Sequence, residues 1–562
     1  MPTDMFTVTA AAPPPGFASG RWELPATFNF GADVVDRYAA DPSLTALLWS
    51  NAAGREERYS FADIARLSNR FAQVLAAQGI VKGDRVLVML PRIPHWQIAL
   101  VGCLKLGAIP IPCIEMLTAR DVAFRIDHAG ARAAVTTTAN TAKFAAIGDP
   151  PAVRIAIAAP SAPGPDGWPD GWPDGWPDGW IDWDAAMDAA PDLFTPAVME
   201  RDEPAILYYT SGSTGHPKGV THAARALFAW RVAAAHWLGL NPGDVMWCTA
   251  DTGWSKAGTG ILFGPWSRGA AVVFHDGPFD PRHRFERIAR HRVNVFCGAA
   301  TEFRRLVMED VSGFDLSSLR HAVSAGEAVN PAVVDRWTAL TGVPLREAYG
   351  QTETLMTVLT MAGDTPRPGC MGLPSPGTEM AVIDEEGGRL PPDTPGQLAV
   401  RLPNPQVMLG YWNDPVRTAQ ARITGPDGDW FQTGDRATVD ADGYFHFLGR
   451  NDDVINSAGY RIGPLEVENA LIEHAAVQEC AAVPSPDEER GEVVKAFVVL
   501  RPGRAGSPEL VKELQDFVKS LTAPYKYPRR IEFIEELPKN ASGKILRRDL
   551  KAREFATGPA RP

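Results

Sequence analysis

The sequence predicts an α/β protein with a large N-terminal domain of several subdomains, one of them β-rich, and a small α+β C-terminal domain. Apolar segments of helical spacing alternate with short apolar runs as far as about residue 360. Short alternating strands with Gly and Pro turns follow, and beyond residue 450 helices and strands form a compact third pattern. A chain of 562 residues is long enough for several domains. We therefore predict domains at 1–450 and 451–562.

The first elements of the chain set the α/β pattern. Residues 1–30 are rich in Pro, Ala and Gly, and we expect them to form an extended arm. SFADIARLSNRFAQVLAAQGI (60–80) has apolar residues at helical spacing, and DRVLVML (84–90) is typical of a buried strand. WQIALVGCLKLGAIPIP (96–112) and RAAVTTT (132–138) continue the alternation. This order predicts a largely parallel sheet covered by helices.

A low-complexity segment interrupts this pattern. Four copies of Pro-Asp-Gly-Trp run from Pro165 to Trp180. Pro-Asp-Gly favours a turn, because proline fixes one φ and glycine permits a positive one. Expansion of a tolerated surface loop is the simpler interpretation, since loops accept insertions at little cost. A strip of tryptophans that binds a ligand is the alternative.

Composition and charge exclude several classes of function. The net charge of −12 disfavours a nucleic-acid partner, which needs clustered Lys and Arg. No apolar run reaches the length of about 18 residues that a membrane span requires. The segment before Arg21 has no basic residue and carries Asp4, so we expect no targeting peptide and a cytoplasmic location. No CxxC pair occurs, and we expect buried, reduced thiols at Cys103, Cys113, Cys248, Cys297, Cys370 and Cys480.

The loop TSGSTGHPKG (210–219) is the first candidate site. It follows the apolar run AILYY (205–209), the usual strand-then-loop order of nucleotide-binding sites. Its small residues offer backbone N–H groups and hydroxyls, and Lys218 adds a positive charge. The spacing is not that of a P-loop, because Lys218 is followed by Gly219 rather than Ser or Thr. A Ser/Gly-rich surface turn is the alternative.

Five motifs in a fixed order then identify a family resemblance. They are YTSGSTGHPKG (209–219), YGQTET (349–354), TGD (433–435), GRNDDVINSAGYRIGPLEVE (449–468) and PKNASGKILRR (538–548). Together they resemble the adenylate-forming superfamily of acyl-CoA synthetases, adenylation domains and firefly-type luciferases, from about residue 30 to 555. Three further segments are most similar to medium-chain and aromatic acyl-CoA synthetases: FNFGADVVDRY (28–38), ADTGWSKAG (250–258) and INSAGYRIGPLEVENAL (455–471).

The resemblance implies a two-step reaction. A carboxylate attacks the α-phosphorus of ATP to give acyl-AMP and pyrophosphate, and the thiol of coenzyme A then displaces AMP. The first step brings two anions together, so positive charge must stabilise it. The resemblance assigns this role to Lys544 and makes Lys218 and Glu353 further catalytic residues. The implied cofactors are ATP, Mg²⁺ and coenzyme A.

The resemblance also implies the nucleotide contacts. Thr214 and Glu353 would hold Mg²⁺, for which a carboxylate and substrate phosphate oxygens are usual ligands. Asp435 would bind the ribose with help from Arg450, and Arg461 would meet the phosphates. The other implied ATP and AMP contacts are Thr210, Ser211, Gly212, Ser213, Thr214, Gly215 and Lys218 in the loop, Gly326, Glu327 and Ala328, and Tyr349, Gly350, Gln351 and Thr352, together with Lys544.

A mobile C-terminal domain is implied as well. Members of the superfamily rotate this domain after adenylation, and Asp452 lies at the position of their hinge. The implied coenzyme A contacts are Ala458, Gly459 and Tyr460 in the pantetheine tunnel, and Arg490, Lys519 and Tyr527 near the nucleotide end. Medium-chain relatives often carry Gln where this chain has Glu115, so that contact is in doubt.

The acyl pocket is expected at Trp254, Ala299, Ala325 and Gly350. Acetate-specific relatives carry a bulky Trp at the position of Gly350, and relatives commonly have prolines in place of Ala299 and its neighbour. Small residues here indicate a roomy pocket, so we predict a medium-length, branched or aromatic acid rather than acetate. Two alternatives remain, since Gly350 can serve backbone geometry alone and Trp254 can be a core residue. Lys256 either points away from the site or meets a polar group on the acid.

Other functions share these motifs. A free-standing adenylation enzyme would load a carrier protein, a luciferase-like oxygenase would consume oxygen, and a non-catalytic protein would only bind nucleotide. Retention of Lys544, Glu353 and Asp435 argues against the last. We also expect regulatory acetylation of Lys544 by a lysine acetyltransferase, reversed by a deacylase, because it would remove the charge that adenylation needs. A homo-oligomer is possible on this sequence.

Overall fold

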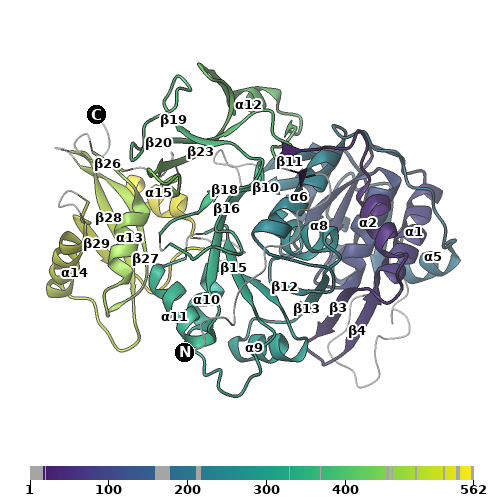
Figure 1. Ribbon diagram of the computed structural model, residues 1–562, viewed down its shortest axis with the longest axis horizontal. Coiled ribbons are helices and arrows are strands. Elements are labelled where there is room, and N and C mark those ends of the chain that lie inside the picture. The colour runs from purple at the N-terminus through teal and green to yellow at the C-terminus, as the bar shows by residue number, and fades with distance from the viewer. Residues whose placement is uncertain are drawn as a thin grey trace.

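The computed structural model separates an α/β body, a β-rich part and a C-terminal α+β part, which follow one another from purple to yellow in Figure 1. The residues it describes are 17–18, 21–158, 178–210, 217–327, 329–367, 369–450, 453, 455–457, 460–487, 490–522, 526–539 and 545–557.

The first sheet of the α/β body is fully parallel. Its order is β6 (Ile109–Cys113), β5 (Arg85–Met89), β7 (Ala131–Thr137), β8 (Val153–Ile157) and β9 (Ile181–Asp182). The helices of this region are α1 (Phe61–Ala77), α2 (Pro94–Leu106), α3 (Ala119–Ala129), α4 (Thr141–Ala145) and α5 (Trp183–Ala189). Helix α1 begins at Ser60, where Ser60 and Asp63 form a reciprocal capping box.

The second sheet has nine strands and carries the candidate site. Its order is β18 (Leu373–Pro374), β17 (Leu355–Leu359), β16 (Leu345–Gln351), β15 (His321–Ala325), β14 (Val295–Gly298), β12 (Val245–Cys248), β13 (Ala271–Asp276), β3 (Thr45–Asn51) and β4 (Glu56–Ser60). The strands from β16 to β3 in this order run parallel. The associated helices are α6 (Ala224–His236), α7 (Ser255–Ala257), η3 (Gly258–Leu262), α8 (Phe263–Ser267), α9 (Pro281–Arg290), α10 (Ala300–Leu306) and α11 (Pro331–Thr341).

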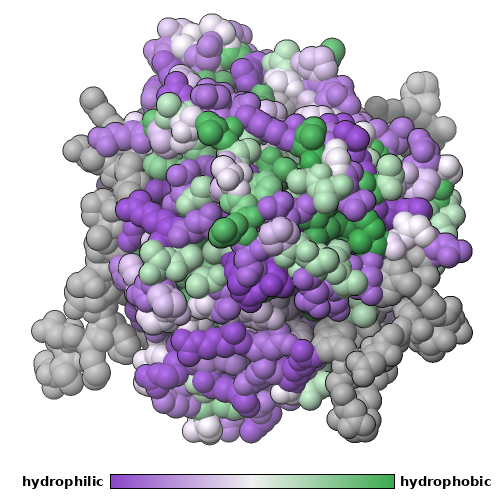
Figure 2. Space-filling model, turned by 90° about the vertical axis from the view of Figure 1, so that its right-hand side faces the viewer, coloured by the Kyte–Doolittle hydropathy of each residue, from purple (hydrophilic) through white to green (hydrophobic). Residues whose placement is uncertain are grey.

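One hydrophobic core joins the two sheets. It contains Val86 and Val88 from the first sheet and Val272 and Phe274 from the second, all fully buried. Trp96 of α2 bridges them, with its ring centroid 5.9 Å from that of Phe274. On the outer face over α1, α2 and α5, Figure 2 shows apolar patches scattered among hydrophilic residues.

The β-rich part consists of two antiparallel sheets. One contains β19 (Met380–Ile383), β20 (Gly396–Arg401), β22 (Arg422–Gly425), β23 (Gly428–Val439) and β24 (Phe445–Arg450). The other contains β10 (Pro204–Thr210), β11 (Lys218–Ala223) and β21 (Gly410–Tyr411), with α12 (Pro415–Gln420) following β21. Strands β10 and β11 flank residues 211–216, so the predicted phosphate loop joins two paired strands.

The C-terminal part has a core of its own. It contains β25 (Ile455–Ser457), β26 (Tyr460–Ile462), β27 (Val477–Asp487), β28 (Gly491–Leu500), β29 (Arg530–Phe533), α13 (Pro464–Ile472), α14 (Pro508–Leu521) and α15 (Arg547–Thr557). A large α/β part followed by a smaller α+β part confirms the predicted fold class. The exact domain boundary at residue 450 stays a prediction.

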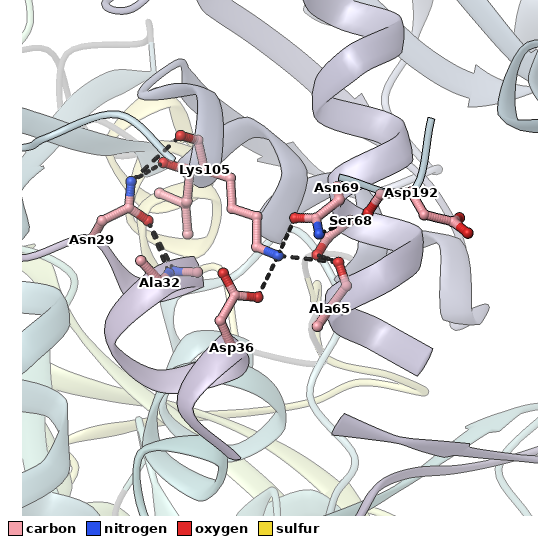
Figure 3. Close-up of polar contacts among 10 residues, drawn as sticks. Asn29, Ala32, Asp36, Ala65, Ser68, Asn69, Lys105 and Asp192 are labelled. Atoms are coloured by element: carbon pink, nitrogen blue, oxygen red, sulfur yellow. Dashed lines mark hydrogen bonds and ion pairs between the residues drawn. The ribbon is translucent and has the colours of Figure 1, made fainter. Parts of the chain in front are cut away.

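A fully buried lysine fastens the N-terminal segment η1 (Gly31–Asp36) to helices α1 and α2. Lys105 Nζ donates to Asp36 Oδ1 at 2.6 Å, to Asn69 Oδ1 at 2.6 Å and to the Ala65 carbonyl at 3.1 Å (Figure 3). Burial lowers the pKa of Lys105, and the adjacent Asp36 opposes this effect. A buried charge is tolerated because its donors are partnered.

The structure also bears on several predictions about residues outside the candidate site. The prediction of an extended arm at residues 1–30 is wrong for its last residues, because Phe28 and Phe30 are buried and pack edge-on against Phe228 and Phe263. Of the Trp repeat, residues 165–177 lie outside the described residues. All six cysteines are free and buried, as predicted. In the described part of the chain no helix combines the length and apolar character needed to cross a membrane. The remaining short elements are β1 (Phe17–Ala18), β2 (Arg21–Trp22) and η2 (Thr138–Asn140).

Candidate active site

The candidate site lies along the carboxyl edge of the second sheet. Strands β12, β14, β15 and β16 are consecutive parallel neighbours and end at Cys248, Gly298, Ala325 and Gln351. In open α/β sheets, ligands bind outside the carboxyl ends of the strands. In Figure 1 this part of the sheet lies between the body of the N-terminal domain and the C-terminal part.

A buried carboxylate connects β23 to β16. Asp435 is 5% exposed, and its Oδ2 accepts hydrogen bonds from Tyr349 Oη and Gln351 Nε2, both at 2.6 Å. Gln351 Nε2 also donates to the Thr433 carbonyl at 2.9 Å. Burial and the Asp435 carboxylate raise the pKa of Tyr349, so its hydroxyl stays protonated and donates. Three predicted nucleotide residues are therefore in contact, and Arg450 lies opposite Asp435 in the β23–β24 ladder.

A tyrosine links the two predicted phosphate and metal residues. Tyr411 Oη donates to Glu353 Oε1 at 3.0 Å, and Lys218 Nζ lies 5.1 Å from the centroid of the Tyr411 ring. Lys218 pairs with Thr210 in the β10–β11 ladder. Burial and Glu353 raise the pKa of Tyr411, which keeps the hydroxyl a donor. Tyr411 was not predicted, because GYW (410–412) after a Gly/Pro-rich run is also typical of an aromatic residue that packs in the core.

Thr352 is held by two residues that were not predicted. His222 Nε2 lies 2.5 Å from the Thr352 carbonyl oxygen. Burial lowers the pKa of His222 to about 4, so the ring is neutral near pH 7 and its Nε2–H donates this bond. Ser255 Oγ and Thr352 Oγ1 are hydrogen-bonded at 3.0 Å. This last contact joins the segment after Trp254 to the nucleotide side.

Lys256 contacts the strand end that carries Ala325, one of the predicted acyl residues. Its Nζ donates to the Gly298 carbonyl at 3.1 Å and to the Ala325 carbonyl at 3.0 Å. These carbonyls end β14 and β15, and Ala299 follows as the first residue before α10. Trp254 precedes α7, in which Lys256 lies, and is partly buried. Lys256 therefore turns toward the strand ends rather than away from the site.

Gly350 has a backbone role that weakens its use as a pocket indicator. A Cβ added there would lie 1.9 Å from the Leu355 carbonyl oxygen and 2.9 Å from Met356 Cα. The β16–β17 ladder is irregular between Tyr349 and Gly350. Any side chain would require the backbone of the hairpin to move. The lack of a side chain at Gly350 therefore does not report the size of the acid.

The predicted adenine segment begins with a glycine of positive φ, and a residue just beyond the segment bonds an acid on β16. Gly326 has a φ of +95°, a conformation that favours glycine. Two residues beyond Glu327, Val329 N–H donates to Glu347 Oε1 at 2.7 Å. Burial raises the pKa of Glu347 to about 7. Glu347 lies on β16, the strand that also carries Tyr349.

Several predicted residues lie outside the described part of the chain. These are Ser211, Gly212, Ser213, Thr214, Gly215, Ala328, Asp452, Ala458, Gly459 and Lys544, together with the side chains of Tyr460 and Arg461. The ends of segment 540–544 are defined, however, because Lys539 and Ile545 form a β-bridge. Lys539 Nζ bonds both oxygens of Glu479 at 2.9 and 2.7 Å, and Arg304 of α10 lies 4.0 Å from Glu479. Lys539, the last described residue before Lys544, thus pairs with Glu479 close to Arg304 of α10.

Of the predicted coenzyme A residues that the structure describes, Lys519 and Tyr527 are in contact. Lys519 Nζ bonds Asp516 Oδ1 at 2.9 Å and lies 4.3 Å from the Tyr527 ring centroid. Arg490 lies between β27 and β28, where its backbone N–H donates to Asp487 Oδ1 at 3.1 Å.

Glu115, where relatives often have Gln, belongs to the first sheet's edge. It accepts a hydrogen bond from Asn140 Nδ2 at 2.7 Å, and burial raises its pKa.

Comparison with known families identifies the chain. Residues 34–412 match the model of the AMP-binding enzyme family, and residues 466–544 match that of the AMP-binding enzyme C-terminal domain. The chain belongs to the AMP-binding enzyme family. Mouse acyl-coenzyme A synthetase ACSM3, mitochondrial (Mus musculus), is 40% identical over 547 residues, which cover 95% of this chain and 92% of that protein. The uncharacterized acyl–CoA ligase YtcI of Bacillus subtilis is 40% identical over 534 residues, which cover 94% of this chain and 97% of that protein.

Solved structures of this family have the same fold. The anthranilate CoA ligase AuaEII in complex with anthranoyl-AMP superposes with a TM-score of 0.84 at 29% identity, covering 95% of this chain and 98% of that one. The benzoate CoA ligase from Burkholderia xenovorans LB400 gives 0.79 at 27% identity, covering 93% and 100%.

Proposed function

We infer that the protein is an AMP-forming acid–CoA ligase. It uses ATP and Mg²⁺ to convert a carboxylic acid to an acyl-AMP, and coenzyme A then takes the acyl group as a thioester. The observation that carries this conclusion is the grouping at one sheet edge of Asp435, Glu353 and Lys218, which lie far apart in the sequence. They provide a polar acceptor, a carboxylate and a cation for a nucleoside triphosphate.

The site has suitable groups for each part of the nucleotide. The Asp435 carboxylate suits ribose hydroxyls, which donate hydrogen bonds, and the hydrogen bond from His222 Nε2 to the Thr352 carbonyl fixes the strand end before Glu353. A single carboxylate together with phosphate oxygens is a usual setting for Mg²⁺, so Glu353 fits the metal. Bound there, Mg²⁺ would neutralise phosphate charge. Tyr411 orients Glu353 with its hydroxyl and presents its ring to Lys218, which positions both charges.

Lys544 is the residue we propose to stabilise charge as the two anions meet. The position of Lys539 and Ile545 at the ends of its segment, beside Glu479 and α10, supports an approach to this face of the N-terminal domain. An ammonium aimed at the developing charge lowers the barrier, because such groups are prearranged for the transition state.

A panel of acids tests the function directly. AMP and pyrophosphate are measured for each acid, with and without coenzyme A. We expect both products, and a thioester only with coenzyme A. Release of ADP would contradict the mechanism, as would oxygen uptake or acyl transfer to a carrier protein in preference to coenzyme A. Lys544→Ala is expected to slow pyrophosphate release about 100- to 1,000-fold. Lys512→Ala, an exposed lysine of α14, is the matched control and should leave the rate unchanged.

The acid is proposed to be of medium length, branched or aromatic rather than acetate. Ala299 and Ala325 at the ends of β14 and β15 support this, since they leave room that larger side chains would fill. The named relatives of this chain include an acyl-coenzyme A synthetase and ligases of benzoate and anthranilate. Equal or higher kcat/KM with acetate than with hexanoate or benzoate would contradict the proposal.

Three further points stay predictions. The domains are proposed to divide at 450, with a hinge at Asp452, which limited proteolysis tests. Acetylation of Lys544 should abolish adenylation, and full activity after stoichiometric acetylation would refute it. Cell fractionation tests the cytoplasmic location, which is of interest because the mammalian relatives ACSM3 and ACSM5 are named as mitochondrial. Light scattering tests the homo-oligomer.

A further inference from the structure

Lys256 is a cation at the acyl side of the site whose bonding is incomplete. A lysine ammonium has three N–H donors. The two carbonyls at the ends of β14 and β15 accept two of them, at 3.1 and 3.0 Å. The Gly298 carbonyl also accepts a hydrogen bond from Ser324 Oγ at 3.1 Å, which helps to fix the strand end that binds this ammonium. Lys256 forms no ion pair with any carboxylate among the described residues.

Lys256 is partly buried, and the strand ends that it contacts are shielded from solvent. Cys248, Cys297 and Ala325, which end or nearly end the three adjoining strands, are all less than 10% exposed. The nearby Glu302 is engaged elsewhere, by Arg284 at 3.1 Å and by Thr249 Oγ1. A charge in an apolar setting is stable when its donors are all partnered. Neutral carbonyls orient the ammonium but do not neutralise it.

The position of Lys256 separates it from the reacting carboxylate. Ser255, its neighbour, bonds Thr352 on the nucleotide side, whereas Lys256 bonds the ends of β14 and β15. The carboxylate that attacks ATP must lie near the phosphates, on the Thr352 and Glu353 side. A group that meets Lys256 is therefore on the acyl part of the acid.

We propose that Lys256 determines specificity by binding a second oxygen-bearing group on the acyl part of the substrate, and that the preferred acids carry such a group. This rests on the proposed function as an acid–CoA ligase. A second carboxylate satisfies both the third donor and the charge. A hydroxyl or keto oxygen accepts a hydrogen bond from the third donor but does not neutralise the charge, so we expect it to bind less tightly than a carboxylate.

Pairs of acids matched in length provide the test. The kcat/KM for AMP formation is measured for monocarboxylic acids of four to eight carbons and for the dicarboxylic, ω-hydroxy and oxo acids of the same length, with benzoate and hydroxybenzoates as an aromatic set. The wild-type protein should prefer the oxygen-bearing member of at least one pair. Lys256→Met should lower kcat/KM for that member about 10- to 100-fold, the usual effect of losing a hydrogen bond to a charged group. The unsubstituted member should change by less than about threefold.

Two controls separate specificity from damage. Lys82→Met removes a lysine whose side chain is 41% exposed and which pairs with Glu203, and it should leave the ratio within each pair unchanged. Urea unfolding of Lys256→Met shows whether the variant folds, and Lys256→Arg should retain part of the preference for dicarboxylic acids.

The possible failures are distinguishable. Equal losses on both members of every pair would overturn the proposal, because Lys256 would then act on the reaction or on folding alone. Wild-type preference for the unsubstituted member throughout would also overturn it, while AMP and thioester formation would leave the ligase function intact. If no acid yields AMP, the proposed function itself fails.

Discussion

Lys105 is fully buried and Lys256 is partly buried, and these two lysines of the N-terminal α/β body are bonded differently. Lys105 donates to a carboxylate, a side-chain amide oxygen and a backbone carbonyl, so its three donors and its charge are satisfied within the chain. Lys256 donates to two backbone carbonyls at the ligand-binding edge of the sheet. A charge completed by the chain holds the fold together, and one left incomplete at a sheet edge is available to a ligand.

The acids of the molecule follow the same division. Asp36, whose side chain is 33% exposed, pairs with the fully buried Lys105 where η1 meets α1 and α2. The contacts of Asp435 and Glu353 include hydrogen bonds from the neutral donors Tyr349, Gln351 and Tyr411. Neutral donors orient a carboxylate and preserve its charge, as a site that binds hydroxyls or a metal requires. The substitutions below test whether structure and function divide in this way.

The largest expected effect is on stability, at Lys105. Lys105→Met should lower the free energy of unfolding by about 1–3 kcal/mol, because the Ala65 carbonyl and the side chains of Asn69 and Asp36 lose the ammonium that they bond. Lys256→Met should lower it by less than about 1 kcal/mol, since no paired charge is broken. Urea unfolding followed by circular dichroism measures both. Similar losses in the two variants would break the comparison.

The next effect concerns ATP. Asp435→Asn keeps the shape of the side chain but removes its charge, and should raise the KM for ATP about 10- to 100-fold with little change in the urea midpoint. Tyr349→Phe removes one of the two donors and should give a smaller rise in the same direction. If the urea midpoint of Asp435→Asn falls as far as that of Lys105→Met, the Asp435 carboxylate stabilises the fold rather than binding ATP.

A moderate effect is expected at Tyr411. Tyr411→Phe removes the hydroxyl that orients Glu353 but keeps the ring beside Lys218, so the Mg²⁺ concentration for half-maximal rate should rise about threefold to tenfold. Glu353→Gln should raise it further. Titration of pyrophosphate release with Mg²⁺ at saturating ATP makes the measurement. Equal Mg²⁺ dependence in the wild type and both variants would exclude Glu353 from the metal site.

The smallest effect depends on pH. The pKa of Glu347 is raised from about 4.5 to about 7 by burial, so between these values the folded chain binds a proton that the unfolded chain has lost. Its contribution therefore weakens as pH rises from 4.5 to 7. Glu347→Gln should gain stability over the wild type across this window, on the order of 1 kcal/mol. A difference that does not change between pH 4.5 and 8 would contradict it.

The sequence determined the local elements and the chemistry of the nucleotide site. Apolar runs such as RVLVM and the helical spacing after Ser60 predicted β5 and α1, because burial of one face selects the period. Ordered motifs predicted which residues handle ATP. The sequence left two roles open for Gly350, and the close backbone of Leu355, brought there by the hairpin, supports the role in backbone geometry.

Only the tertiary structure decided which of these residues meet. Tyr349 and Asp435 are 86 positions apart and are joined because β16 and β23 face each other. Tyr411 entered the site because β21 pairs with β11. The direction of Lys256 was open in the sequence, since a lysine side chain reaches either solvent or a strand end. The carbonyls at the ends of β14 and β15, adjacent only through sheet pairing, fixed it.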